Sequence, residues 1–328
     1  MTATTPTPRK LALAAPLLAL LATASEPAQA IVSTTASSNW LATDDSLDGV
    51  AKLLINGSTG CSGTLLAGGA YVLTAAHCVT NSSGQLTATQ ISVTLDGGAV
   101  TAQVSASSQI SVYGSWNGST LGLNNDLALL KLDSAVTSVE GYQVYAGQSL
   151  GSTVILAGYG YTGTGSTGYS SGSFGTLHWG MNTYDLLYSG RSGSLVYDFD
   201  DGTTAHNATG STGLGSTEAG IAPGDSGGAS FIAAADGSYY LVGVHSFGGR
   251  ETGSDTTDID GTLNGSYGEY AGDTGFYSAA TARWLIGLAG SGVVVTSLPT
   301  VAGLVPEPGS AALMAAGGLL LALRRRKA

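Results

Sequence analysis

The chain has 328 residues, and its 22 Asp and Glu outnumber its 11 Lys and Arg, for a formal net charge of −11. A surface with this excess of acid repels nucleic acid and anionic lipid, so no nucleic-acid partner is expected. No segment recurs at a fixed period, which disfavours a repeat solenoid.

The beginning of the chain has the three parts of an export signal. Residues 9–10 are basic, residues 11–24 are apolar, and residues 28–30 read Ala-Gln-Ala, which suits a signal peptidase. The apolar run has about 14 residues, against the roughly 20 that a membrane-spanning helix needs. We therefore predict a signal peptide over residues 1–30, in preference to a membrane anchor, and a mature chain that begins at Ile31.

The following body, about residues 31–290, has the pattern of an all-β protein. Short apolar runs are separated by turns rich in Gly, Ser and Thr, which is typical of antiparallel strands. Helical patterns are scarce. The clearest predicted elements are the strands AKLLI (51–55), ISVTL (91–95), TVILAGYG (153–160) and YYLVGVHSF (239–247) and the helix SAATARWLIGL (278–288).

Two cysteines, Cys61 and Cys78, lie seventeen positions apart. An even number of cysteines in an exported chain favours a disulfide, worth about 3 kcal/mol on loop-closure arithmetic. A metal site would need more ligands than His77 alone supplies nearby. The sequence therefore predicts a disulfide and no metal.

Three segments carry the side chains for nucleophilic catalysis. VLTAAHCV holds His77, NNDLALLKL holds Asp126, and PGDSGGA holds Ser226. A serine hydroxyl attacks at neutral pH only if a base such as histidine removes its proton. A carboxylate can orient that histidine and stabilise its charged form, and glycines beside the serine allow a tight turn that aims backbone amides at an oxyanion.

In the order His, Asp, Ser, these segments resemble the chymotrypsin/trypsin family of serine peptidases. The motifs TAAHC and GDSGG together carry the resemblance, which extends from about Ile31 to Leu288. It implies an all-β fold of two antiparallel six-stranded β-barrels, about residues 31–145 and 146–277, followed by a short helix. It also implies a catalytic triad of His77, Asp126 and Ser226, and an oxyanion hole formed by the amides of Gly224 and Ser226.

Further segments match the family's pattern. Cys61 and Cys78 fall where the family has the disulfide of its histidine loop. The resemblance implies that Ser246 hydrogen-bonds the catalytic aspartate. It also implies that one stretch of chain pairs with the substrate backbone, namely Ser246, Phe247 and Gly248.

Substrate preference is read from the residues expected around the specificity pocket. The resemblance implies that the residue six positions before the nucleophile lines the pocket floor; here it is Gly220, which brings no carboxylate and disfavours cleavage after Lys or Arg. Ile221 makes the base apolar, while Gly248 and Gly275 leave the walls open. A neutral or apolar residue before the cut bond (P1) is favoured. The alternative is an acidic P1, because a histidine at the position of His245 contacts the substrate carboxylate in glutamate-specific relatives.

The resemblance also implies an activation pair. In this family a new amino terminus, commonly Ile-Val, folds inward and pairs with the aspartate before the nucleophile. Ile31 and Asp225 would form that pair here, so signal peptidase itself would create the activating terminus. Relatives continue with Gly-Gly, whereas this chain has Ser33 and Thr34.

Other polar residues are interpreted as solvated. Asp255, Asp258 and Asp260 lie in an acidic loop that lacks the spacing of a calcium-binding hand, so a solvated loop is favoured over a calcium site. His178 and His206 lie in Gly/Thr-rich sequence and are expected at the surface.

The end of the chain carries a second processing signal. A linker over residues 291–304 leads to Val-Pro-Glu-Pro at 305–308, an apolar stretch at 309–323 and a basic cluster at 324–327. An apolar segment followed by basic residues holds a tail at the inner membrane with its charges in the cytoplasm. This order resembles the PEP-CTERM sorting tail of Gram-negative bacteria, which an exosortase cleaves, and implies transient membrane contact. The alternative is a plain C-terminal anchor.

Together these features predict a serine endopeptidase exported to the cell surface or medium. Its partners would be a protein or peptide substrate, with signal peptidase and exosortase as processing enzymes. The mechanism requires no cofactor. Without the leader and the tail, the body keeps 5 basic and 20 acidic residues, a formal net charge of −15. The alternative function is a non-catalytic surface or matrix protein built on a protease scaffold.

Overall fold

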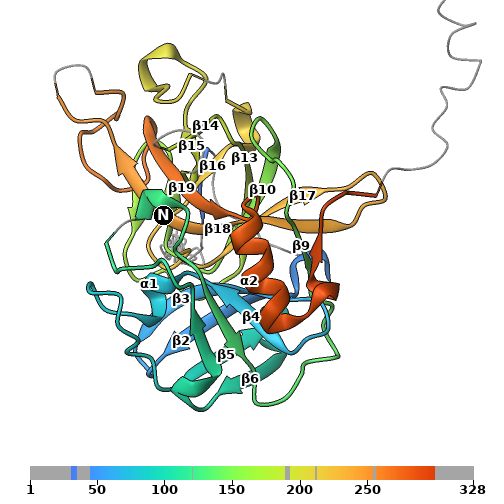
Figure 1. The fold of residues 1–328 in the computed structure, drawn as a ribbon. Coiled ribbons are helices and arrows are strands. Elements are labelled where there is room, and N and C mark those ends of the chain that lie inside the picture. The colour runs from blue at the N-terminus through green and yellow to red at the C-terminus, as the bar shows by residue number, and fades with distance from the viewer. Residues whose placement is uncertain are drawn as a thin grey trace, which may run out of the picture.

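A computed structural model describes residues 31–34, 45–119, 121–188, 193–210, 213–253 and 256–299. The predicted signal peptide and sorting tail lie outside the described residues. Figure 1 shows two curled sheets, one formed by the first half of the body and one by the second half. This arrangement confirms the predicted all-β fold of two antiparallel barrels. Within the described ranges, no helix combines the length and hydrophobicity needed to cross a membrane.

The first sheet contains seven strand segments instead of the six expected for its barrel. Alternating burial in β5 shows why these sequences form strands, since every second side chain enters the core. The spatial order is β6 (Val100–Val104), β5 (Ile91–Leu95), β2 (Val50–Ile55), β3 (Thr59–Leu65), β4 (Tyr71–Thr74), β8 (Ala128–Lys131) and β7 (Ile110–Val112).

The second sheet has nine strand segments. Its main path runs β13 (His178–Thr183), β10 (Thr153–Gly158), β17 (Ala229–Ala233), β18 (Tyr239–Arg250), β19 (Glu269–Gly275), β15 (Leu195–Phe199) and β14 (Leu186–Leu187). Two further strands extend it: β9 (Gln143–Tyr145) pairs with β18, and β20 (Val294–Val295) pairs with β9.

A small third sheet places the beginning of the body against the second barrel. Its order is β12 (Gly168–Ser170), β11 (Thr162–Thr164), β1 (Ile31–Ser33) and β16 (Ala219–Gly220). Ile31 and Val32 are almost fully buried in it. The strand is thus held by its apolar side chains as well as by backbone pairing.

The helices are short. The predicted C-terminal helix is α2 (Ala279–Ala289), capped by Ser278, whose side chain accepts a hydrogen bond from the Thr281 amide. The other helical segments are α1 (Ala76–Val79), η2 (Asp45–Leu47), η3 (Asp96–Gly98), η4 (Ser107–Gln109), η5 (Leu121–Leu123), η6 (Thr204–His206), η7 (Gly215–Thr217) and η8 (Ser291–Val293).

The start of the predicted linker is part of the fold. Beyond α2, η8 leads into β20, which adds to the edge of β9. The linker prediction was wrong for residues 291–295, because the free edge of β9 offers backbone hydrogen-bonding groups that this apolar stretch can use.

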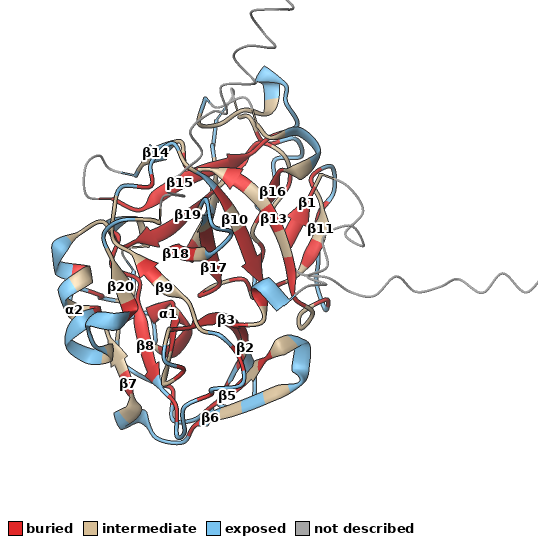
Figure 2. Ribbon diagram, turned by 90° about the vertical axis from the view of Figure 1, so that its right-hand side faces the viewer, coloured by how far each residue is buried: buried red, intermediate tan, exposed pale blue. Residues whose placement is uncertain are grey.

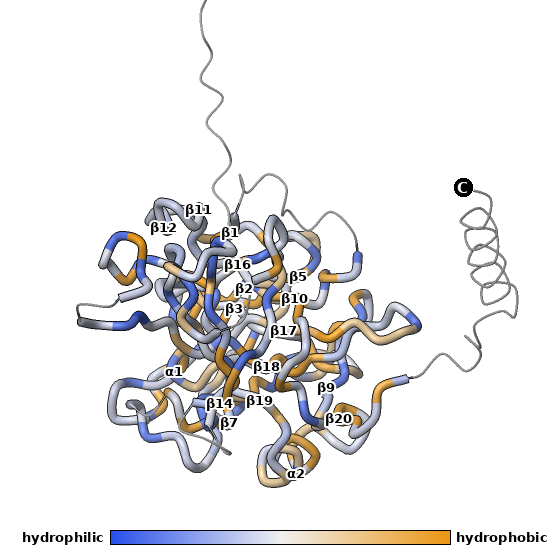
Figure 3. The backbone as a smooth tube through the Cα atoms, turned by 90° about the horizontal axis from the view of Figure 1, so that it is seen from above, coloured by the Kyte–Doolittle hydropathy of each residue, from blue (hydrophilic) through white to orange (hydrophobic). Residues whose placement is uncertain are grey.

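Apolar side chains of the two sheets form the core. Figure 2 shows buried residues concentrated on the strands, with exposed residues on α2 and the outer loops. Figure 3 shows apolar segments along the strands and α2, whereas the peripheral loops are more hydrophilic. The packed sheets therefore give a rigid support for loops that meet where the two halves join.

Candidate active site

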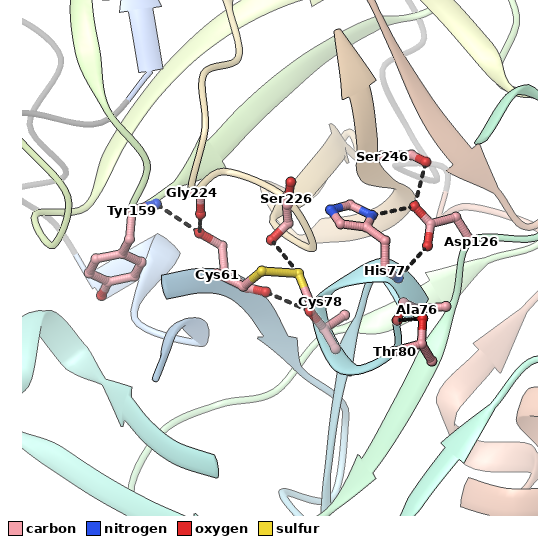
Figure 4. Close-up of a disulfide and its surroundings, with 12 residues drawn as sticks. Cys61, Ala76, His77, Cys78, Thr80, Asp126, Tyr159, Gly224, Ser226 and Ser246 are labelled. Atoms are coloured by element: carbon pink, nitrogen blue, oxygen red, sulfur yellow. Dashed lines mark hydrogen bonds and ion pairs between the residues drawn. A yellow bond between two sulfur atoms is a disulfide. The ribbon is translucent and has the colours of Figure 1, made fainter. Parts of the chain in front are cut away.

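The three predicted triad residues come from different parts of the fold. His77 lies on α1 directly after β4, Asp126 precedes β8, and Ser226 lies in the turn between β16 and β17. Figure 4 shows the His77 ring between Asp126 and Ser226. The fold therefore brings together side chains contributed by both barrels.

Asp126 is the centre of a buried hydrogen-bond cluster. It is completely buried, and its Oδ2 accepts hydrogen bonds from His77 Nδ1 at 2.6 Å and from Ser246 Oγ at 2.6 Å. Its Oδ1 accepts from the His77 backbone amide at 2.8 Å. Because Nδ1 donates to the carboxylate, Nε2 of His77 is the ring nitrogen left to accept a proton.

The backbone around Ser226 has two amides available for a ligand. Asp225, Gly227 and Gly228 donate their amides to protein carbonyls, but among the described residues the amides of Gly224 and Ser226 have no protein acceptor. Such a pair of amides is the arrangement that stabilises an oxyanion. Within the described chain no hydrogen bond joins Ser226 Oγ to His77, a contact that commonly tightens only when substrate binds.

Two glycines in this turn require their special conformations. Gly224 and Gly227 have φ values of 97° and 82°, a region that residues with a side chain rarely adopt. A Cβ on Gly227 would lie 2.0 Å from Thr74 Oγ1 and 2.4 Å from the Ser62 carbonyl oxygen. The glycines thus allow the serine turn to pack directly on β3 and β4.

Ser62 is a positioning residue that the sequence analysis missed. Its hydroxyl donates to the Gly224 carbonyl at 2.9 Å and accepts from the Tyr159 amide at 2.9 Å, and its amide donates to the Ser226 carbonyl at 2.8 Å. Its position directly after Cys61 was the available signal. The disulfide between Cys61 and Cys78 is confirmed and ties the Ser62 strand to the His77 helix.

The predicted activation pair also comes together. The Asp225 carboxylate is completely buried and accepts hydrogen bonds from Gly160 at 2.8 Å, from Ala222 at 2.9 Å, and from the Ile31 amide. Burial raises the pKa of Asp225 to about 6, against the lowering effect of these amides and of the nearby His245.

The backbone of Ile31 is strained. Its φ is 63°, an unusual value for a β-branched residue. The φ angle of Ile31 describes where the carbonyl group of the preceding peptide bond lies relative to Ile31. Cutting that bond would therefore remove the strain, which typically amounts to about 1 to 3 kcal/mol.

Three of the predicted pocket residues line one small pocket. Gly220, Ile221 and Gly248 meet there, and the other lining residues are Tyr197, Phe199, Gly265, Glu269, Tyr270 and Ala271. Ser246 and Phe247 lie beside it on β18, at a bulge in the pairing with β19. A larger cavity lies elsewhere and is lined by other residues, from Asp45–Ser46, Glu140–Gln143 and Gly237–Tyr240.

Gly275 does not line this pocket. The register of β18 and β19 pairs it with Gly243, and it exchanges hydrogen bonds with the Asn124 side chain. Ala271 lies opposite Gly248 instead. The prediction for Gly275 was wrong because the β18 bulge and the strand register, which the sequence does not display, select the residue that faces Gly248.

His245 belongs to a completely buried polar cluster. Its Nδ1 lies 2.9 Å from Asp273 Oδ1, and Asp273 Oδ2 accepts hydrogen bonds from Tyr184 at 2.6 Å and Ser230 at 2.5 Å. All four residues are buried. Asp273 was also missed from the sequence, because its role depends on strand pairing across 28 residues.

Neither of the two histidines expected at the surface is fully exposed. His178 is completely buried on β13, and burial lowers its pKa to about 4. His206 is partly buried and its Nδ1 lies 2.8 Å from Asp201. The strand period of β13, which alternates buried and half-buried residues, directs His178 inward.

The carboxylates of the acidic loop bind the loop's own backbone. Asp258 accepts from the amides of Asp260 and Gly261, and Glu269 accepts from the amides of residues 264–266. In the described part of the chain, no group of three or more His, Cys, Asp and Glu is arranged to hold a metal ion. Asp255 lies outside the described residues.

Two curled antiparallel sheets with a histidine, a buried aspartate and a glycine-flanked serine at their junction define the chymotrypsin-like class of protein. A family model described as Trypsin matches residues 42–262. The chain belongs to the trypsin family, and its body is a domain of the serine-peptidase type.

Proposed function

We propose that this protein is a serine endopeptidase whose triad is His77, Asp126 and Ser226. The observation that carries the proposal is the buried Asp126 carboxylate, which accepts hydrogen bonds from both the ring and the backbone of His77. That arrangement holds the ring in the tautomer that leaves Nε2 free to act as a base.

The proposed reaction follows from this tautomer. Ser226 Oγ attacks the carbonyl carbon of the scissile bond while its proton passes to His77 Nε2. The amides of Gly224 and Ser226 stabilise the resulting oxyanion. Collapse breaks the C–N bond, and the leaving amine takes the proton from Nε2. Water then releases the acyl group from Ser226 by the same steps.

The proposed substrate is a protein or peptide with an uncharged P1 residue. Gly220 brings no carboxylate to the pocket, and Ile221, Phe199 and Ala271 contribute apolar walls. Ser246, Phe247 and Gly248 would pair with the substrate backbone. A trypsin-like preference for Lys or Arg is disfavoured, because Glu269, the carboxylate in the pocket lining, already accepts hydrogen bonds from the amides of residues 264–266.

Export and processing form part of the proposal. Signal peptidase would cut after Ala30, and the new Ile31 ammonium would pair with Asp225. The burial of Ile31 and its strained φ in the linked chain support this step. The C-terminal tail would hold the protein at the inner membrane of a Gram-negative cell until an exosortase cuts it, which leaves the enzyme at the surface or in the medium.

Labelling with a serine-directed phosphonate tests the function. Processed protein that begins at Ile31 is expected to take up one phosphonate, and the matched Ser226→Ala protein none. The non-catalytic alternative would be favoured if both proteins or neither took up the label and if no peptide of a mixed library were cleaved.

A further inference from the structure

Two buried polar atoms without partners in the described part of the chain belong to Tyr197, which lines the specificity pocket, and to His245, which lies on the same face of the sheet. They are the hydroxyl of Tyr197 and Nε2 of His245, and neither finds a hydrogen-bond partner among the described residues. A buried polar group without a partner costs about 1 to 3 kcal/mol. Two such atoms beside a ligand pocket indicate that the ligand supplies the missing bonds.

Strand register places the two residues on one face of the second sheet. Tyr197 pairs with Ala271, which pairs with Gly248, and these three residues line the pocket. Asp273 lies two positions after Ala271 on β19 and pairs with His245 on β18. Because residues two apart on a strand point to the same side, His245 lies in the row directly behind the pocket wall.

The hydrogen bonds around His245 define what its free nitrogen can do. The tautomer in which Nδ1 donates to Asp273 Oδ1 leaves Nε2 as a hydrogen-bond acceptor. Burial raises the pKa of Tyr197 well above its usual value, and the carboxylates of Asp273 and Asp225 raise it further. The phenol therefore keeps its proton and can donate it.

The surrounding charges disfavour an ionic side chain. The carboxylate of Glu269 lines the pocket and that of Asp273 lies behind it, so a P1 carboxylate would add a third negative charge. The oxygens of these carboxylates already accept bonds from backbone amides or from buried side chains, so a P1 cation would find no free acceptor among them.

A hydrocarbon side chain would leave both polar atoms unpaired. A primary amide has one donor group and one acceptor, the complement of an imidazole acceptor and a phenol donor. We infer that the pocket selects a P1 side chain that ends in a primary amide, Gln or Asn, whose NH2 donates to His245 Nε2 and whose oxygen accepts from Tyr197. This inference rests on the proposed function and deepens it.

The test uses processed protein that begins at Ile31, first shown to be active by phosphonate labelling. Matched peptides that differ only at P1 would carry Gln, Asn, Glu, Leu or Lys. We expect kcat/KM for Gln or Asn to exceed that for Leu by about tenfold or more, since each hydrogen bond worth 1.4 kcal/mol contributes a factor of ten.

Tyr197→Phe provides the decisive variant, because it keeps the ring and removes only a hydroxyl that has no partner among the residues the structure describes. It should lower the ratio of amide to Leu cleavage about tenfold. Tyr113→Phe, in which the same change is made on the ring packed against Trp284 in another part of the fold, should leave that ratio unchanged. Retained phosphonate labelling checks that the variants fold.

The outcomes separate the two proposals. Labelled protein that cleaves fastest after Leu, Glu or Lys, or whose amide preference survives Tyr197→Phe, would overturn the inference and leave the peptidase standing. Protein that neither labels nor cleaves would overturn both.

Discussion

The peptide bond before Ile31 should change the stability of the protein in a pH-dependent way. We compare two forms in a Ser226→Ala background, so that neither digests itself. One begins at Ile31 with a free ammonium, and the other carries residues 24–30 attached. In the attached form Asp225 is completely buried, and its hydrogen-bond donors within the described residues are the neutral amides of Gly160, Ala222 and Ile31.

The magnitude follows from the pKa of Asp225. In the attached form burial raises this pKa from 3.8 to about 6. The native state therefore binds the proton more tightly than the unfolded chain, and stability falls as pH rises from about 4 to 6. At 1.36 kcal/mol per pH unit, the loss is about 3 kcal/mol. A free ammonium pairs with the carboxylate and removes this loss, since a buried ion pair stabilises only when both partners are present.

Urea unfolding, followed by tryptophan fluorescence at pH 4 and pH 7, measures the effect. The free-terminus form should gain about 3 kcal/mol relative to the attached form between these pH values. Relief of the Ile31 strain adds an advantage that does not depend on pH. Burial raises the pKa of Glu218 to about 7 in either form, so its contribution cancels in the comparison. A difference in stability that is equal at both pH values would refute the pairing of Ile31 with Asp225.

Three further substitutions test other parts of the structure. Asp126→Asn should lower kcat about 10⁴-fold with little change in KM, because the amide favours the wrong tautomer of His77. The rate of peptide hydrolysis measures this change in kcat. A loss of less than tenfold would contradict the proposed triad. His178→Gln should remove a loss of stability at acid pH. Because burial lowers the pKa of His178 to about 4, the free energy of unfolding of the native protein falls by about 3 kcal/mol as pH decreases from 6.5 to 4. If urea unfolding shows the same pH dependence in the variant, His178 is not its cause. Gly227→Ala should destabilise the fold by more than 1 kcal/mol and reduce phosphonate labelling. The new Cβ would lie 2.0 Å from Thr74 Oγ1, at a φ of 82°. A variant with normal stability and labelling would show that the serine turn can shift to accept the methyl group.

Local motifs allowed much of the site to be predicted. His77, Asp126 and Ser226 each lie in a short segment whose residue types indicate a role, and the structure brings the three together. The disulfide was predictable because the chain has only two cysteines. Strands such as β5 and the helix α2 were predictable because their side-chain periods are local.

Strand pairing decided what the sequence could not show. The β18 bulge places Ala271, and not Gly275, opposite Gly248. Cross-strand register also joins His245 to Asp273, and it leaves Tyr197 against the pocket. These contacts depend on which residues face each other across neighbouring strands, and a shift of one residue would turn every side chain to the opposite face. The sequence by itself therefore determined the fold class and the candidate chemistry, whereas the tertiary structure decided the shape and polarity of the pocket.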